Sequence, residues 1–330
     1  MSEKIAPIRR STRTWSLLGD VKKRPSPYEV VTSNFHYHFR RDPVPFELSP
    51  EAPLNRWYLK YREGSALQME DWEGFRDPQR LTYRSYVALQ HNREVIMDSI
   101  IDRFEQEEST DRLSQEWLGV MRDIYAPARF PIHVLQMTAL YLGQMAPSAF
   151  ITNVAHFQGG DELRRVQWIA YRCKSLALSY GEELASSEVA RHAWEDAPTW
   201  QPMRKVFEEL LLAYDWGECF VAMNLVVKPL FDAVFNEGIG RAALLHGDSL
   251  TSAMQVELAH DSARAREWTS ALVHYACDNN AENREVIRSW VEKWQDRSRD
   301  AFTGLAASLE NAIVPDLDAA QQGFLSSLGL

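Results

Sequence analysis

The sequence has few cysteines and no long hydrophobic run. Only three of its 330 residues are cysteines, at positions 173, 219 and 277. This odd number and wide spacing argue against a disulfide framework and a thiolate metal site, and they fit a reducing compartment. The most apolar stretch, residues 219–227, ends at Lys228-Pro229, well short of the about 20 residues that a membrane-spanning helix needs. We therefore expect a cytoplasmic protein with no membrane partner.

The sequence also lacks an excess of positive charge. Its 46 acidic residues outnumber its 36 lysines and arginines, which gives a formal net charge of -10. Nucleic-acid-binding domains usually carry a basic patch, so nucleic acid is not an expected partner. Several common catalytic motifs are missing as well, because the sequence contains no G-x-S-x-G, P-loop or G-x-G-x-x-G.

Residues 1–55 differ in composition from the rest of the chain. Seven of the 15 prolines lie here, and proline does not fit the interior of a regular helix. We therefore predict an extended N-terminal arm, within which "NFHYHFR" (34–40) alternates as a strand does. Its aromatic side chains need a surface to bury them, either in this chain or, as we favour, in another chain. The candidate partner-binding anchors are Trp15, Tyr28, Phe35, Tyr37, Phe39 and Phe46.

From about residue 56, apolar residues recur at helical spacing. Two long amphipathic helical pairs are expected, at roughly 131–180 and 206–278. Four such helices can form a bundle whose inner positions hold metal. Little else favours strand, so the predicted fold class is all-α. Residues 56–312 form the predicted helical domain, and residues 313–330 form a short C-terminal extension.

The helical pairs raise the question of a metal site. A di-iron carboxylate bundle takes one Glu-x-x-His motif from each of two helices, and this spacing places both ligands on one helix face. Among the nine histidines, only His260 follows a carboxylate at this spacing, Glu257. An alternative function is therefore a di-iron oxygenase that uses Glu218, Glu257 and His260. A single Glu-x-x-His is a weak signal among 46 acidic residues.

In "QGGDELRRVQW" (158–168), arginine occupies the places where histidine ligands are needed. Guanidinium stays protonated and has no lone pair, so it cannot bind a metal cation. Two interpretations stay open: buried carboxylates neutralised by guanidinium groups, or solvated pairs on a helix surface. Either way, we predict no metal here. Within the two expected helical pairs, the carboxylates followed three residues later by arginine are Asp161, Glu162 and Asp261, and their arginines are Arg164, Arg165 and Arg264.

Several segments together resemble a known family. They occur in order from about Arg13 to about residue 312. The resemblance is to the β subunit of the hydroxylase component of bacterial multicomponent aromatic monooxygenases, of the toluene/o-xylene monooxygenase type. The segments are "RTWSLLGDVKKRPSPYEVV", "ELSPEAPLNRWYLKYRE", "YRSYVALQ", "LQMTALYLGQMAPS", "DWGECFVAMNLVVKP" and "VIRSWVEKW".

This resemblance implies a ferritin-like fold and a non-catalytic structural role. In that family the α subunit carries the di-iron centre, and the hydroxylase is an (αβγ)₂ assembly. The resemblance thus implies α and γ subunits and a second copy of this chain as partners. A regulatory protein, a Rieske ferredoxin and an NADH reductase would be indirect partners.

The α-subunit pattern Asp-Glu-x-Arg-His can be laid over residues 161–165. Four of the five positions fit, and the missing one, at Arg165, is the iron ligand. Residues 260–264 likewise keep a carboxylate and end in arginine. The resemblance therefore implies no catalytic residue and no cofactor in this chain.

Overall fold

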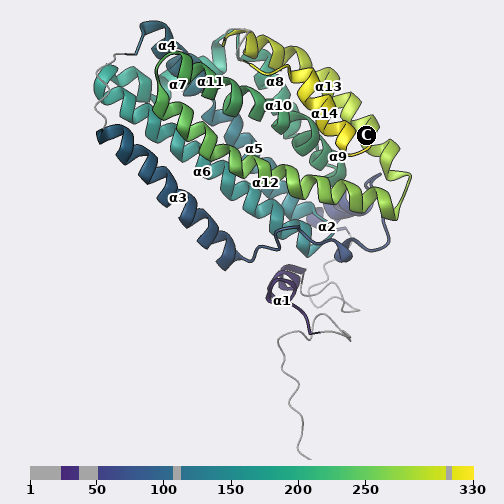
Figure 1. The fold of residues 1–330 in the computed structure, drawn as a ribbon. Coiled ribbons are helices and arrows are strands. Elements are labelled where there is room, and N and C mark those ends of the chain that lie inside the picture. The colour runs from purple at the N-terminus through teal and green to yellow at the C-terminus, as the bar shows by residue number, and fades with distance from the viewer. Residues whose placement is uncertain (1–23, 37–50, 107–112, 310–313) are drawn as a thin grey trace, which may run out of the picture.

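The computed structural model describes residues 24–36, 51–106, 113–309 and 314–330. Within these ranges the chain forms helices and no strand, which confirms the predicted all-α class. Figure 1 shows long helices that run side by side in one body. No helix among the described residues is long and apolar enough to cross a membrane.

Four long helical segments form the centre of the fold. Helices α5 (Arg129–Met145) and α6 (Ala149–Tyr180) make one pair, joined by a three-residue connection. The second pair consists of the helical segment 216–245 and α12 (Ser249–Asn279). Such short connections make neighbouring helices antiparallel. In Figure 1, α6 and α12 lie beside each other along the body.

The segment 216–245 is a composite helix of five consecutive stretches. It contains two π-helical stretches, whose i→i+5 hydrogen bonds place more residues in each turn than an α-helix has. We call this segment the composite helix. Its stretches are α9 (Trp216–Val221), π-helical Ala222–Val227, α10 (Lys228–Asp232), π-helical Ala233–Gly238 and α11 (Ile239–Leu245).

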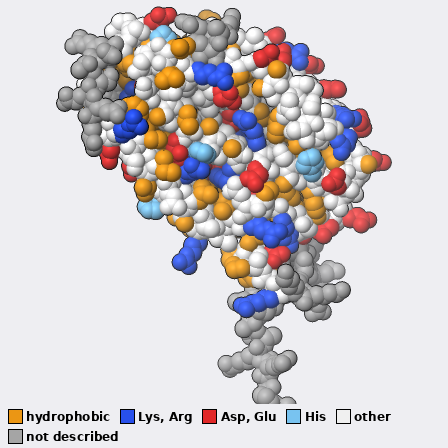
Figure 2. Space-filling model, viewed as in Figure 1, with side chains coloured by type: hydrophobic (Ala, Val, Ile, Leu, Met, Phe, Trp, Pro, Cys, Tyr) orange, Lys and Arg blue, Asp and Glu red, His pale blue; other side chains and the backbone are white. Residues whose placement is uncertain are grey.

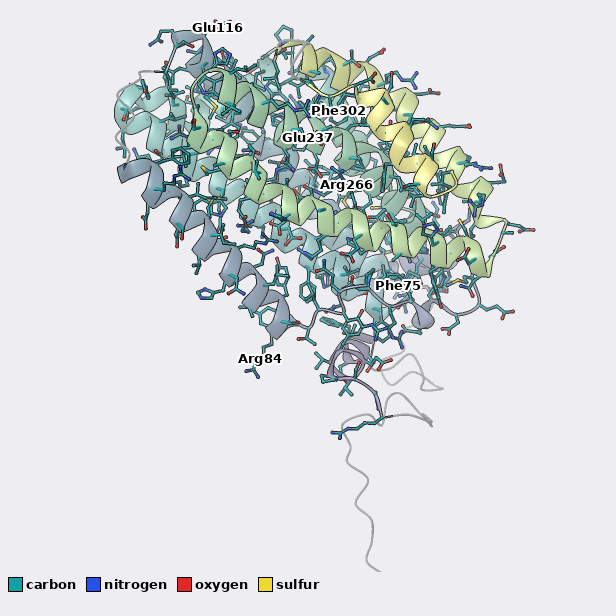
Figure 3. The ribbon with its side chains drawn as sticks, viewed as in Figure 1. Phe75, Arg84, Glu116, Glu237, Arg266 and Phe302 are labelled. Carbon is teal, nitrogen blue, oxygen red and sulfur yellow. The ribbon has the colours of Figure 1, made fainter. Side chains whose placement is uncertain are left out.

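Further helices surround this centre. Helix α3 (Tyr83–Gln106) packs on α12 along one edge, and its Arg84 points away from the body in Figure 3. Helix α13 (Asn283–Ala307) buries Phe302, also labelled in Figure 3, against the composite helix. The shorter helices are α2 (Pro53–Tyr58), α4 (Gln115–Val120), α7 (Ser187–Asp196), α8 (Gln201–Leu210) and α14 (Leu317–Ser327).

The described part of the N-terminal region is helical, which corrects the prediction of an extended arm there. Helix α1 (Pro27–Thr32) is followed by a 3₁₀ turn at 33–36, so no strand begins at residue 34. Ser26 caps α1: its hydroxyl accepts from the backbone N–H of Glu29, and the Glu29 carboxylate accepts from the backbone N–H of Ser26. Proline is tolerated in the first turn because that N–H has no intrahelical partner.

The predicted C-terminal extension also contains a packed helix. Helix α14 lies against α10, and Leu325 and Leu328 are buried. The C-terminus is thus attached to the composite helix, as Figure 1 shows in yellow beside α13.

Candidate functional site

Two consecutive glycines of α6 allow neighbouring helices to approach closely. A Cβ added at Gly159 would lie 2.9 Å from Cδ2 of Leu140 on α5. A Cβ added at Gly160 would lie 2.5 Å from the hydroxyl oxygen of Tyr86 on α3. The two glycines therefore hold α6 between α5 and α3, just before its charged residues begin.

The four charged side chains that follow are all buried, on two different sides of α6. Asp161 and Arg164 are 5% and 6% exposed and face α3 and α12, whereas Glu162 and Arg165 are 2% and 4% exposed and face the composite helix. The interpretation of solvated pairs on a helix surface therefore does not describe them. We call the two groups the outer and the inner cluster.

The hydrogen-bonded ion pairs of the outer cluster cross between helices. Arg264 of α12 donates to Asp161 of α6, and Nη1 of Arg164 donates to Oδ2 of Asp261 at 2.8 Å. Within α12, by contrast, Nη2 of Arg264 lies 4.0 Å from Oδ1 of Asp261. The spacing of three in the sequence thus identifies the right residues but not their hydrogen-bonding partners, which lie on the opposite helix.

Helix α3 completes the outer cluster with polar side chains. Tyr86 donates to Oδ1 of Asp161 at 2.9 Å, and Gln90 donates to the same oxygen at 2.7 Å. Nε of Arg164 donates to Glu94 at 2.5 Å. Burial raises the pKa of Asp161 well above its usual value, and the guanidinium of Arg264 opposes this effect. The carboxylate therefore depends on its donors from α3 and α12.

The inner cluster places two carboxylates around one ammonium group. Nζ of Lys228 lies 2.6 Å from Oε1 of Glu162 and 3.1 Å from Oδ2 of Asp232. Nη1 of Arg165 donates to Oδ1 of Asp232 at 2.7 Å, and its Nη2 donates to Asn236 at 2.6 Å. Two anions and two cations make the cluster formally neutral.

Mutual attraction favours the charged forms of Asp232 and Lys228. Burial raises the pKa of Asp232, but Lys228 and Arg165 outweigh this and bring it below its usual value. Arg266 of α12, labelled in Figure 3, adds to the lowering. Burial likewise lowers the pKa of Lys228, but Asp232 and Glu162 outweigh it and raise that pKa. Removing any one member therefore leaves an opposite charge buried without its partner.

A polar stripe on the composite helix carries half of the inner cluster. Its members follow at steps of four: Asn224, Lys228, Asp232 and Asn236. In a regular α-helix a step of four overshoots a full turn by about 40°, so such a stripe would wind away from its neighbour. The π-helical stretches turn less per residue and bring the stripe back toward α6. This stripe was not predicted from the sequence, although polar residues at every fourth position of an apolar run signal it.

The residues of the alternative di-iron hypothesis do not come together. Glu218, near the start of α9, lies 2.7 Å from Nζ of Lys293 on α13. Glu257 is buried 3.4 Å from Nη1 of Arg93, whereas His260 is exposed. Among the described residues, no group of three His, Cys, Asp or Glu side chains could hold a metal ion. The donor set of these residues therefore does not fit a di-iron centre.

Two of the six proposed arm anchors lie in the described ranges. Tyr28 is 4% exposed and its ring centroid lies 5.5 Å from that of Phe150, so this residue packs within its own chain rather than on a partner. Phe35 is 49% exposed, at the edge of His156. The remaining anchors lie outside the described residues: Trp15, Tyr37, Phe39 and Phe46.

The fold and the two clusters define a ferritin-like helical bundle whose central carboxylates are neutralised by arginine and lysine. A family model described as Methane/Phenol/Alkene Hydroxylase matches residues 57–280. The chain is 36% identical over 303 residues to the toluene-4-monooxygenase system, hydroxylase component subunit beta, of Ectopseudomonas mendocina, covering 91% of this chain and 92% of that protein. The chain therefore belongs to the methane/phenol/alkene hydroxylase family.

Other relatives and solved structures agree with this assignment. The phenol 2-monooxygenase oxygenase component DmpL of Pseudomonas sp. (strain CF600) is 26% identical, over 91% of this chain and 85% of that protein. A toluene 4-monooxygenase (T4moH) structure with toluene in its resting active site matches with a TM-score of 0.82 and 34% identity, over 93% of this chain and 99% of that one. Phenol hydroxylase from Pseudomonas sp. OX1 shares the fold, with a TM-score of 0.79 at 20% identity over 98% of both chains. The expected ferritin-like fold and family resemblance are confirmed.

Proposed function

We propose that this chain is the non-catalytic structural β subunit of a di-iron aromatic-ring hydroxylase of the toluene/o-xylene or phenol monooxygenase type. It supports an iron-bearing α subunit in an (αβγ)₂ assembly. The observation that carries this proposal is the similarity to a hydroxylase subunit beta along nearly the whole length of both chains.

The charge clusters support a structural rather than a catalytic role. At the helix positions where a carboxylate bundle needs metal ligands, this chain has Arg165 and Arg264, which cannot donate a lone pair. Their guanidinium groups instead bind carboxylates across helices. We place the di-iron centre in the partner α subunit for this reason.

The surface supports association with other chains. Large apolar side chains are exposed on α3, where Tyr83 is 71% exposed, and around α11 and α12, where Leu245 and Val256 are 70% and 66% exposed. Figure 2 shows hydrophobic side chains among interspersed acidic and basic ones on one face. Exposed apolar patches commonly mark protein interfaces. We assign these surfaces to contacts with the α and γ subunits and a second copy of this chain.

The remaining components of the system follow from the same proposal. A regulatory protein, a Rieske ferredoxin and an NADH reductase act on the assembled hydroxylase, in the cytoplasm, and do not need this chain's own residues for electron transfer. The aromatic substrate binds in the α subunit.

Co-purification with iron analysis tests the proposal. The tagged full chain is co-expressed with candidate α and γ chains, and the purified complex is assayed for subunit ratio and iron. We expect an equimolar complex whose iron content follows the α chain, and no iron in this chain alone. Two irons per isolated chain with oxygenase activity would refute the proposal in favour of the di-iron alternative. A stable monomer that never binds an α chain would also refute it.

A further inference from the structure

Two buried carboxylates from different helices converge on one cation. Glu162 of α6 and Asp232 of α10 are 2% and 1% exposed, and Nζ of Lys228 lies between them. Burying two carboxylates without a nearby cation is very costly, because each must lose its hydration and they repel each other. The two carboxylates are therefore arranged as in a cation-binding site, and the cation they bind is the ammonium group of the Lys228 side chain.

The Lys228 ammonium group is a compact cation, and it leaves one carboxylate oxygen of the site without a hydrogen bond in the described part of the chain. An ammonium group is a point charge with three donors, similar in shape to a small bound cation and unlike the planar guanidinium. Oε2 of Glu162 is buried and accepts no hydrogen bond from the described residues, with Nη1 of Arg165 at 3.8 Å. A carboxylate oxygen thus remains directed into the cluster with capacity to bind a further donor.

Charge balance selects the class of cation that fits. Glu162 and Asp232 carry two negative charges, and Arg165 neutralises one of them through its 2.7 Å contact with Asp232. One positive charge is needed to balance the other, and Lys228 supplies it. A divalent ion beside Arg165 would leave excess positive charge in the bundle core, so a monovalent, hydrogen-bond-donating cation fits best.

We propose that Glu162 and Asp232 form a buried binding site for a primary ammonium ion, and that Lys228 fills this site from within the chain. The tethered ammonium closes the site to ions from solution. This inference concerns a ligand site of the chain itself and holds whether or not the chain is a hydroxylase subunit.

Chemical rescue of Lys228→Ala in the full-length chain tests the proposal. Propylammonium replaces the three carbons and the nitrogen that this substitution removes. We expect the variant to have a lower Tm than wild type, and propylammonium chloride to raise its Tm saturably by roughly 2–4 °C over sodium chloride or tetramethylammonium chloride of equal ionic strength. Wild type should show no such difference. An equal response of the variant to all three salts would overturn the proposal.

Two further variants separate a filled cation site from simple loss of a lysine. Lys293→Ala removes the ion pair with Glu218 near the surface and should show no specific response to propylammonium. If Lys228→Ala does not fold, the double variant Glu162→Gln/Lys228→Ala decides the question. It removes one anion together with the cation, so it should fold better than Lys228→Ala and ignore propylammonium. A double variant as unstable as the single one would contradict the proposed site.

Discussion

Arg264 of α12 donates a hydrogen bond to Asp161 of α6, across 103 positions of sequence. The reverse contact, from Arg164 of α6 to Asp261 of α12, spans 97 positions. Each helix thus gives the other both an acid and an arginine. The exchange fixes how the two helices lie against each other, because neither helix can slide without separating two buried pairs.

Breaking one of these pairs should destabilise the chain strongly. Arg264→Met leaves Asp161 buried without its cation, and removing one partner of a buried pair typically costs about 3–5 kcal/mol. The double variant Asp161→Leu/Arg264→Met removes both charges and should recover most of this loss. Urea denaturation of the full chain measures the free energy of unfolding of all four proteins in the cycle.

An exposed pair provides the control for this cycle. Arg191 contacts Glu195 on the surface of α7, and Arg191→Met should leave the urea midpoint unchanged. The interpretation fails if the loss in the double variant equals the sum of the two single losses, because the two charges would then act independently.

Gly160→Ala should also destabilise the chain, because the new methyl group meets the Tyr86 hydroxyl that binds Asp161. Forcing a methyl group into a packed contact costs about 1–3 kcal/mol. In a Tyr86→Phe background the clash is smaller, so the loss caused by Gly160→Ala should shrink. Chemical denaturation checks both effects.

Gly119 offers a matched control, since it is also helical and an added Cβ would meet no atom of the described residues within 4 Å. Gly119→Ala should be neutral or stabilise by about 0.4–1 kcal/mol. Equal losses for both glycines would show that a general property of helical glycine, and not the approach of Tyr86, is responsible.

The sequence predicted the fold class and the charged residues but not how they pair. Helical periodicity reveals which residues share one face of a helix, so the all-α class and the positions of Asp161 and Arg264 could be found. It does not reveal which helix that face meets, and for this reason the cross-helix exchange was not predictable. Lys228 and Asp232 were not predicted because the acid-x-x-Arg and Glu-x-x-His patterns test a spacing of three, whereas these two residues are four positions apart in α10.

The short helix at 27–32 could have been predicted from its capping residues, which received less weight than the high proline content of residues 1–55. Ser26 and Glu29 have the spacing of a capping box, and Pro27 stands where a helix accepts proline. A high proline content excludes a long helix but permits a short one that begins at a proline.

Truncations of different length should separate folding from assembly. Removing residues 1–23 keeps Tyr28 and its packing on Phe150, so Tm should stay near that of wild type while binding to the α subunit weakens. Removing residues 1–50 also deletes Tyr28, whose burial is worth about 1.5–3 kcal/mol, and should lower Tm. Thermal unfolding and co-purification measure the two effects. Unchanged binding in both truncations would contradict a role of the arm in assembly.

Acidification should destabilise the chain partly through His156. Burial lowers the pKa of this imidazole below its usual value of 6.5, while the unfolded chain keeps the usual value. Below about pH 6.5 the unfolded state therefore binds a proton that the folded state resists, so the free energy of unfolding falls as pH falls. Above this pH the imidazole is neutral in both states, and His156 does not change how stability depends on pH. His156→Gln cannot titrate, so it should lose less stability than wild type between about pH 7.5 and about pH 5.5.

Urea midpoints at the two pH values measure this difference, with His192→Gln as the control. The His192 side chain is 78% exposed, so its removal tests the loss of a histidine that the fold does not bury. Protonation of carboxylates also lowers the stability of every variant as pH falls. Comparing each variant with wild type cancels this common contribution. The cause assigned to His156 is wrong if His156→Gln and His192→Gln retain the same slope, because burial of the imidazole would then play no part in the acid sensitivity.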